Sequence, residues 1–573
     1  MWLFLCAAFV IGNYPLLFTR MPYGHDILGS MSRIESMAVA IKNGQFPIVI
    51  LPTQAGGFGC LGILYSHLFF YIPALAKCAG ASTICAYQFG CFVIQLMAAF
   101  LMVCSVRMIQ RTNDENDGDD RCAAFFAAAL FLLMPYRIGD MFWREAFSES
   151  IAMSFLPLII AAVYQMGKAK GTRAERAWIW LSLGMTGVFQ SHMLTFIIAV
   201  VMTTVLCLMY IKKDIIIGAG KAAGLFILLN LWYIVPFLRF YFMDINTDYL
   251  KTDMSEKAGS FSEMLFAGDY QETPNVIGVI SFLILILSAV ALIRMSIRKK
   301  KGEGEGEGAG VLSLLWYLFA SGVIGIFLAS SYFPWKVVGA RIDAVNMFQF
   351  PFRFLLVEAV CFPMLAGLLF GYDAGGNKKG DPVRLAAEDR RAGTVSALSL
   401  LIALLLAAAG VVSAANEYNG MNTESFDYTV NNADFDYRQE YLPEGVTSAD
   451  FADNAPIIPP NFTTLRYEKD YGRIEWAFEN ADEQADSCID VPLIYYPGYL
   501  ARLLDEEGKK QGELETTMGN HHWVRVLIPK EIRGGTVLIS YGGFWYFKLA
   551  GLISLISLVF LIGLAVYSKK RRI

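Results

Sequence analysis

The sequence predicts a polytopic α-helical membrane protein with about twelve transmembrane helices and one strand-rich domain outside the membrane. The chain is 55% hydrophobic and 14% aromatic, only 17% of its residues are charged, and its mean hydropathy is +0.46. Soluble domains carry charges on about a quarter of their residues, so this composition favours a membrane protein. The charges are also segregated. Residues 416–543 hold 10 Lys and Arg against 23 Asp and Glu, a net −13, and the rest of the chain is therefore +9.

Twelve apolar segments are candidates to cross a bilayer, whose hydrocarbon core needs about 20 apolar residues per helix. They are residues 1–19, 84–106, 122–136, 149–166, 178–190, 193–211, 221–240, 275–294, 311–330, 353–371, 395–415 and 544–567. The first lacks the basic start and small-residue cleavage site of a signal peptide, so we expect a membrane helix there. Residues 60–79 are also apolar, but His67, Tyr71 and Pro73 suit a polar boundary. We interpret them as an interfacial or re-entrant helix.

Basic loops set the expected orientation, because cytoplasmic loops are enriched in Lys and Arg. The basic residues are Lys168, Lys170, Arg173, Arg176, Lys212, Lys213, Arg298–Lys301, Lys378, Lys379, Arg384, Arg390, Arg391 and Lys569–Arg572. Both termini are then cytoplasmic, and the outer loops are 20–83, 136–149, 241–274, 331–352 and 416–543. The chain divides into a transmembrane domain over 1–415, an extracytoplasmic domain over 416–543, and a last helix with a basic tail over 544–573.

The outer domain shows the two-residue alternation of half-buried strands. Four segments alternate in this way: Arg473–Phe478, Val491–Tyr495, Trp523–Ile528 and Thr536–Tyr541. Turn sequences lie between them at 496–499 and 533–535. We therefore expect a small β-sandwich or jelly-roll-like domain held between the last two spans.

The sequence lacks several short catalytic and nucleotide-binding motifs, so the classes of protein that these motifs define are excluded. It has no G-x-x-x-x-G-K-[ST], G-x-S-x-G, H-E-x-x-H or C-x-x-C pattern. Its ten cysteines lie mainly in apolar segments, which indicates buried side chains and not a disulfide framework. No basic and aromatic surface for nucleic acid is present, and His521-His522 lacks the partners of a metal site.

The first outer loop contains a candidate catalytic carboxylate, Asp26, a few residues after the first span. Apolar residues recur at helical spacing from Leu28 to Lys42, which predicts an amphipathic helix lying on the membrane surface. Arg33 is seven residues after Asp26, two turns along one helix face. The alternative is that Asp26 only caps this helix by accepting bonds from its first N–H groups.

Two further outer segments concentrate polar residues. The first runs from Pro135 to Glu149 and carries Tyr136, Arg137, Asp140, Arg144 and Glu145. An aromatic and basic interfacial belt is the alternative reading, but such belts rarely need several carboxylates as well. The second contains Gln349 and Arg353 at the mouth of a helix that also holds Glu358, and charge inside a membrane helix usually has a function. His192 is a weaker candidate, because a structural histidine that forms a hydrogen bond at a helix corner is at least as good an interpretation.

These motifs resemble a known family. The sequence His25-Asp26 after the first span, Arg33, the glycine-rich turn Gly56–Gly59, the loop from Tyr136 to Glu149, and the run Phe348–Arg353 are similar to those of large bacterial GT-C-like membrane proteins. The most similar are the YfhO-type proteins and those called 6-pyruvoyl-tetrahydropterin synthase-related membrane proteins. A pterin synthase needs a histidine-rich zinc site, which this chain lacks, so the pterin label carries no functional expectation.

The resemblance implies a GT-C-like fold in the bacterial plasma membrane and inverting transfer of a sugar from a polyprenyl-phosphate donor. The acceptor would be an envelope glycan or lipid at the outer face. Asp26 would be the catalytic base, and the substrate-binding residues would be His25, Arg33, Tyr136, Arg137, Asp140, Arg144, Glu145, Gln349 and Arg353. The family pattern has a His four residues after this Asp, whereas this sequence has Ser30.

Two other functions remain open at the level of sequence. One is a non-catalytic envelope-assembly protein whose acidic outer domain binds glycan, and the other is a transporter of lipid-linked glycans. No cofactor is required, although Asp26 with Asp140 or Glu145 could bind a divalent cation. The partners expected are the bilayer, the lipid-linked donor and the acceptor, with no nucleic acid.

Overall fold

The computed structural model describes residues 2–17, 26–113, 121–169, 171–245, 251–266, 276–301, 308–375, 441–451, 453–480, 486–505 and 507–570. His25, the expected span 395–415 and the basic residues 378–391 lie outside these ranges. The chain forms two compact units, which are described separately. The first comprises 1–27, 88–226 and 250–426, and the second comprises 28–87, 227–249 and 427–573.

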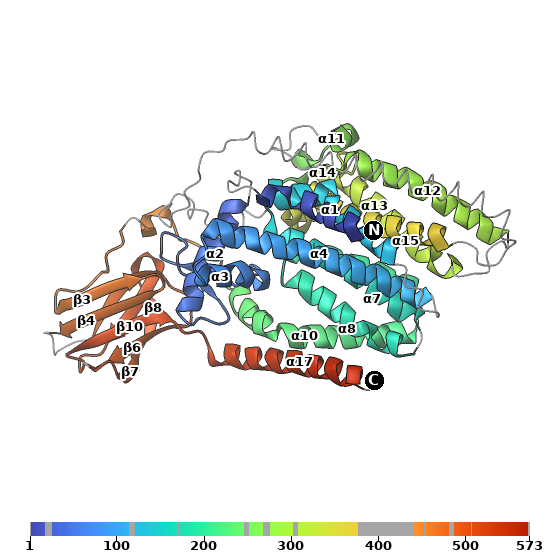
Figure 1. The fold of residues 1–573 in the computed structure, drawn as a ribbon. Coiled ribbons are helices and arrows are strands. Elements are labelled where there is room, and N and C mark those ends of the chain that lie inside the picture. Colours follow the sequence, from blue (N-terminus) through green and yellow to red (C-terminus); the bar gives the residue numbers. More distant parts are fainter. Residues whose placement is uncertain are drawn as a thin grey trace. The chain divides into compact units, whose positions relative to one another are not determined.

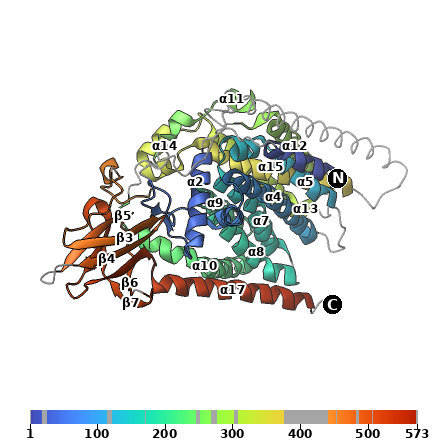
Figure 2. The same ribbon diagram turned by 60° about the vertical axis from the view of Figure 1, so that its left-hand side comes forward.

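The first unit is helical (Figures 1 and 2). Its α-helices, two of which continue into the second unit, are α1 (Trp2–Gly12), α4 (Thr83–Asn113), α5 (Arg121–Leu133), α6 (Pro135–Ile138), α7 (Phe147–Lys168), α8 (Gly171–Phe189), α9 (Met193–Met209), α10 (Lys213–Tyr241), α11 (Phe261–Phe266), α12 (Gly278–Lys300), α13 (Gly308–Ala329), α14 (Trp335–Arg341) and α15 (Leu355–Gly375). A π-helical turn (Gly139–Trp143) follows α6, and 3-10 turns occupy Tyr14–Leu17, Met254–Lys257, Asp343–Phe348 and Pro351–Phe354.

Small residues allow the helices of the first unit to approach closely, as in many membrane bundles. A Cβ added to Gly187 of α8 would lie 2.4 Å from the Phe155 side chain of α7. A Cβ on Gly322 of α13 would lie 2.3 Å from Phe362 of α15. Glycine at these places is therefore a packing requirement and not a turn signal.

Seven helices among the described residues are long and apolar enough to cross a membrane, or eight if one bent pair counts as a span. They are Thr83–Thr112, Phe147–Lys168, Lys213–Tyr241, Gly278–Lys300, Val311–Ala329, Pro351–Gly371 and Trp545–Leu564, and the bent pair is Arg121–Leu133 with Pro135–Trp143. The expected spans 1–19 and 193–211 contain shorter apolar helices, Trp2–Gly12 and Met193–Met209. A mostly helical fold with several candidate spans is confirmed, and the number of twelve spans stays a prediction.

The second unit combines residues 28–87, most of the predicted first outer loop, with residues 227–249 and the strand domain. It contains α2 (Ile27–Lys42), β1 (Ile50–Leu51), β2 (Cys60–Leu61), a 3-10 turn (Leu68–Phe70), α3 (Tyr71–Cys78), a 3-10 turn (Ser448–Phe451), β3 (Phe462–Asp470), β4 (Arg473–Asn480), β5 (Ser487–Ile494), β6 (Tyr499–Leu504), β7 (Lys510–Leu514), β8 (Thr516–Met518), a 3-10 turn (Asn520–His522), β9 (Trp523–Ile528), β10 (Gly534–Tyr541) and α17 (Trp545–Lys570).

The described strands form three antiparallel sheets. One has the order β3-β4-β10-β6-β7, which Figure 1 shows side by side, the second has the order β5-β9-β8, and the third is the short pair β1-β2. Alternate residues are buried, such as Ile474, Trp476 and Phe478 on β4. Each of the four predicted strand segments lies on a strand of the structure. The prediction of a strand-rich domain is confirmed, while its jelly-roll character stays a prediction.

The helix predicted after Asp26 is present as α2, but the prediction that it lies on a surface is wrong. Both its apolar and its polar residues are buried, with Arg33 8% and Glu35 9% exposed. The polar ones have partners from residues 43–83 of the same unit. Thr53 N–H donates to Ser36 Oγ at 3.1 Å, and Lys77 Nζ lies 2.8 Å from Glu35 Oε1. The covering segment directly follows the helix but has no regular helical pattern of its own, so helical periodicity within α2 could not reveal it.

Residues 60–79 contain only a short apolar helix, Leu68–Cys78, which has about half the length needed to cross a bilayer. We therefore expect both ends of this segment on one side of the membrane. In a background without native cysteines, Lys42→Cys and Ser82→Cys, both at exposed positions, should react equally with an impermeant maleimide added outside. Labelling of one site from outside and of the other only after permeabilisation would make 60–79 a span.

Candidate active site

The helical chain breaks between α5 and α6, and the segment that follows the break carries several buried polar side chains. The chain bends by 53° between Arg121–Leu133 and Pro135–Trp143. Met134 at the break is extended (φ −62°, ψ 129°), as expected for a residue before proline, and Pro135 starts α6. Tyr136, Arg137 and Asp140 then follow within two turns, and each is 0% exposed. The break thus places several polar side chains inside the first unit.

Glu149, in the first turn of α7, is the common acceptor of this cluster. Its Oε1 accepts a hydrogen bond of 2.8 Å from the Tyr136 hydroxyl. Its Oε2 lies 3.1 Å from Arg144 Nη1 and 3.4 Å from Arg353 Nε. Glu149 is 1% exposed, so these charges interact with little screening by water.

Arg144 is held by two carboxylates. Its Nη1 also donates to Asp140 Oδ1 at 2.6 Å, and Asp140 Oδ2 accepts from Ser150 Oγ at 2.8 Å. The guanidinium carbon lies 5.0 Å from the centre of the Phe352 ring. Burial opposes the charge of Arg144, but Glu149 and Asp140 outweigh it and raise its pKa well above the ordinary value. This cation is permanent.

Arg137 differs from Arg144 because its hydrogen-bond partners are uncharged. Its Nη2 and Nε donate to Gln95 Oε1 at 2.9 and 3.2 Å, and its Nη1 donates to Ser154 Oγ at 3.4 Å. The guanidinium also packs over the Phe131 ring at 4.5 Å. Arg137 is fully buried. In this conformation Arg137 connects α6 to α4 and α7 through hydrogen bonds, and its guanidinium adds a positive charge to the cluster.

Asp26 is attached to this cluster through its backbone. Its N–H donates to the Arg144 carbonyl oxygen at 2.9 Å, and its side chain is exposed. Its carboxylate acts electrostatically on both Asp140 and Arg144. No hydrogen bond from the first turn of α2 to this carboxylate occurs among the described residues. The geometry therefore offers an accessible carboxylate beside a buried, charged cluster.

The other predicted site residues do not all belong to this cluster. Glu145 is 0% exposed and has a left-handed backbone (φ 56°), and Gln349 has φ 63° and donates its N–H to Asn346 O at 3.1 Å. Arg353 Nη1 donates to Phe348 O at 3.0 Å. Arg33 belongs to the second unit. The cluster therefore gathers Tyr136, Arg137, Asp140, Arg144 and Arg353.

Sequence reasoning did not select Gln95, Ser150 and Ser154, because they are neutral residues on helices that look uniformly apolar. It gave little weight to His192, which caps α9 with its Nδ1 2.8 Å from Thr195 Oγ1. Burial lowers the pKa of His192 to about 3, so this side chain is neutral. Among the described residues, no group of three His, Cys, Asp or Glu side chains is arranged to hold a metal ion.

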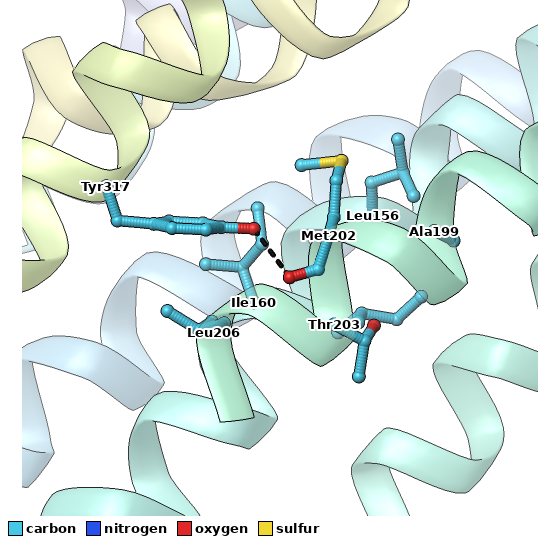
Figure 3. Close-up of a pocket in the computed structure, with 8 residues that line it drawn as sticks. Leu156, Ile160, Ala199, Met202, Thr203, Leu206 and Tyr317 are labelled. Carbon is cyan, nitrogen blue, oxygen red and sulfur yellow. Dashed lines mark hydrogen bonds between the residues drawn. The ribbon is translucent and has the colours of Figure 1, made fainter. Parts of the chain in front are cut away.

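A separate pocket lies between α7, α9 and α13 (Figure 3). Its lining is almost entirely apolar, and the Tyr317 hydroxyl is already used, since it donates to Met202 O at 2.9 Å. The pocket has no charged residue in its lining that could hold a phosphate or activate a hydroxyl. The buried polar cluster with Asp26 is therefore the better candidate site.

No family model matches the sequence, and neither does any curated protein. Solved structures similar to the chain include the arabinofuranosyltransferase AftD from Mycobacteria (15% identity, TM-score 0.42, 72% of this chain and 26% of that one). Others are the Archaeoglobus fulgidus oligosaccharyltransferase tethered to an acceptor peptide (15%, 0.38, 71% and 55%) and the arabinosyltransferase EmbB from Mycobacterium smegmatis (10%, 0.33, 93% and 62%). The chain spans about a quarter of the first protein and over half of the other two. Similarity this distant assigns no activity.

Proposed function

We propose that this chain is a GT-C-like glycosyltransferase of the bacterial plasma membrane. It transfers a sugar from a polyprenyl-phosphate donor to an envelope glycan or lipid at the outer face, with both termini cytoplasmic and 416–543 outside. The observation that carries the proposal is the exposed Asp26 carboxylate, which is tied through its own N–H to Arg144 of the buried cluster.

The chemistry requires a base and a cationic region for the leaving group. Asp26 removes the proton of an acceptor hydroxyl while that oxygen bonds to the anomeric carbon. The bond from this carbon to the phosphate oxygen breaks on the opposite face, so the configuration inverts. The products are the glycosylated acceptor, polyprenyl phosphate and a proton released later from Asp26. An ordinary carboxylate is sufficiently basic for such a transient role.

Arg353 is the proposed contact for the donor phosphate. Its Nε has no hydrogen-bond partner among the described residues, and the nearest carboxylate oxygen, on Glu149, is 3.4 Å away. Arg144, in contrast, already contacts two carboxylates. An anion could thus use the spare N–H of Arg353 without breaking the Arg144 pairs, and charge-assisted bonds of this kind are the stronger ones.

One observation favours a second candidate, the transporter of lipid-linked glycans. Glu358, on α15, is 0% exposed, and neither of its carboxyl oxygens has a hydrogen-bond partner among the described residues. A buried carboxyl group inside a membrane helix is a common component of proton-coupled transport. The non-catalytic envelope-assembly role has no such specific observation in its favour.

Reconstitution in liposomes distinguishes these functions. Purified protein is mixed with a panel of polyprenyl-phosphate donors carrying radiolabelled mannose, glucose or arabinose, and with envelope glycan from the source membrane. A glycosyltransferase converts at least one donor to polyprenyl phosphate and labels the acceptor. Movement of intact donor across the bilayer without conversion would instead establish a transporter. If neither conversion nor movement is observed, both proposals are overturned.

A further inference from the structure

Arg33 and His67, in the second unit, form a buried polar pair that the proposed chemistry does not use. Arg33 is 8% exposed and His67 is 1% exposed. Arg33 Nη1 and His67 Nε2 both lack a hydrogen-bond partner among the described residues. Leaving such atoms unmatched costs about 1–3 kcal/mol each, so their presence together calls for a bound group.

Tyr65 is a neighbour of both side chains. The Arg33 guanidinium carbon lies 4.5 Å from the centre of the Tyr65 ring, and His67 Nδ1 lies 2.9 Å from the Tyr65 carbonyl oxygen. Burial lowers the His67 pKa to about 4, against the opposing effect of nearby carbonyl groups, and the charge of Arg33 lowers it further. The imidazole is therefore neutral at physiological pH.

The hydrogen bond to Tyr65 fixes the tautomer of this neutral imidazole. A carbonyl oxygen can only accept, so Nδ1 carries the proton and donates it to Tyr65 O. Nε2 is then unprotonated and can only accept. Arg33 Nη1, in contrast, can only donate. The group that satisfies both atoms must accept from Arg33 and donate to His67. A hydroxyl group does both, whereas a fully ionised phosphate or a carboxylate cannot donate.

Aromatic rings surround the pair. The His67 ring lies 5.9 Å from Tyr71 and 6.1 Å from Trp232. Phe46 contacts the same two rings, at 6.1 Å from Tyr71 and stacked at 5.9 Å on Trp232 with planes 9° apart. Phe46 is 63% exposed, although a large apolar ring gains by burial. Aromatic walls with a few placed polar atoms are typical of sites for small organic ligands.

Trp232 lies on a segment of α10 whose backbone is hydrogen-bonded to α17. Its backbone N–H donates to Ser554 Oγ of α17 at 3.1 Å, and the same hydroxyl donates to Leu228 O at 2.9 Å. The backbone at Trp232 is therefore held by α17, while Phe46 is the exposed ring of this aromatic group.

We propose that the second unit contains a saccharide-binding site in which one sugar hydroxyl accepts from Arg33 Nη1 and donates to His67 Nε2, with the Phe46–Trp232 pair supporting the sugar ring. The site concerns binding alone and is independent of the proposed transfer reaction. It also gives Arg33 a partner other than the phosphate suggested by the sequence.

Calorimetric titration of the full-length protein tests this site, in a detergent without a sugar headgroup. The ligands are methyl glycosides of glucose, galactose, mannose and arabinofuranose, with inorganic phosphate as the anionic alternative. At least one glycoside should bind, and Phe46→Ala should weaken it about tenfold or more. Phe242→Ala is the matched control, since Phe242 is 79% exposed in the same unit and outside this aromatic group, and it should bind normally.

Deoxy analogues identify the hydroxyl. One monodeoxy form of the binding glycoside should lose about tenfold in affinity for the wild-type protein. In His67→Phe the difference between this form and the parent glycoside should be smaller, because the acceptor atom is gone and only the bond from Arg33 to the hydroxyl remains. Asp26→Asn should bind the glycoside as the wild type does, whatever becomes of transfer. Binding of phosphate in place of glycosides, binding of no glycoside, or unchanged affinity in Phe46→Ala would overturn the proposal in favour of an anion or a trapped water.

Discussion

Replacing Asp26 with Asn is expected to lower glycosyl transfer by about 10²- to 10⁴-fold, the usual contribution of a general base. The amide keeps the size of the side chain and loses its basicity. Donor binding should change little, because the proposed phosphate contact is Arg353. The measurement is turnover of the donor by protein in liposomes, with donor affinity determined on the same preparation.

This substitution also separates catalysis from helix capping. Asn and Asp are about equally good at a helix N-terminus, so Asp26→Asn leaves any capping contribution intact. Asp26→Ala would remove both roles and is therefore less informative. Asp214→Asn is a matched control, because the Asp214 side chain is 79% exposed and its ion pair with Lys212 is a long one of 3.9 Å. It should turn over donor normally. Normal turnover by Asp26→Asn would remove the base from the mechanism and return Asp26 to a capping role.

The strands show what local patterning can and cannot reveal. Trp523–Ile528 was predicted with the bounds that β9 has, because its alternating residues pack on one face. The nine residues of β3 were missed. Arg466, Glu468 and Asp470, at alternate positions, give this strand a charged outer face, and only Phe462 of its residues is buried. An edge strand of that kind carries almost no apolar signal.

The candidate site was partly predictable for a different reason. Tyr136, Asp140, Arg144 and Glu149 lie close together in sequence, so their charges stand out between two apolar segments. The bond from Arg137 to Gln95 joins residues 42 positions apart, and it involves a neutral amide within a long apolar helix. Such partners depend on helix packing, which one sequence does not specify. The exposure of Asp26 beside buried arginines likewise required the structure.

Replacing Glu149 with Ala is expected to destabilise the protein by about 3–5 kcal/mol, the usual cost of removing one partner from a buried ion pair. The change removes the acceptor for Tyr136 and the nearest carboxylate of Arg353, and it leaves Arg144 with Asp140 alone. Arg144 would then keep one carboxylate, and Arg353 would lose the one nearest to it, in a region with little water. Unfolding in mixed micelles of increasing SDS content measures the difference.

The destabilisation caused by Tyr136→Phe is the reference with which the destabilisation caused by Glu149→Ala is compared. It removes only the hydroxyl that donates to Glu149 at 2.8 Å, which should cost about 1 kcal/mol. Glu149→Ala combined with Arg353→Met should be less destabilising than the sum of the single changes, because removing the cation relieves the charge left unpaired. If Glu149→Ala costs no more than Tyr136→Phe, water must reach the arginines and compensate them. The cluster would then be an open anion site, with Arg144 as available to the donor phosphate as Arg353.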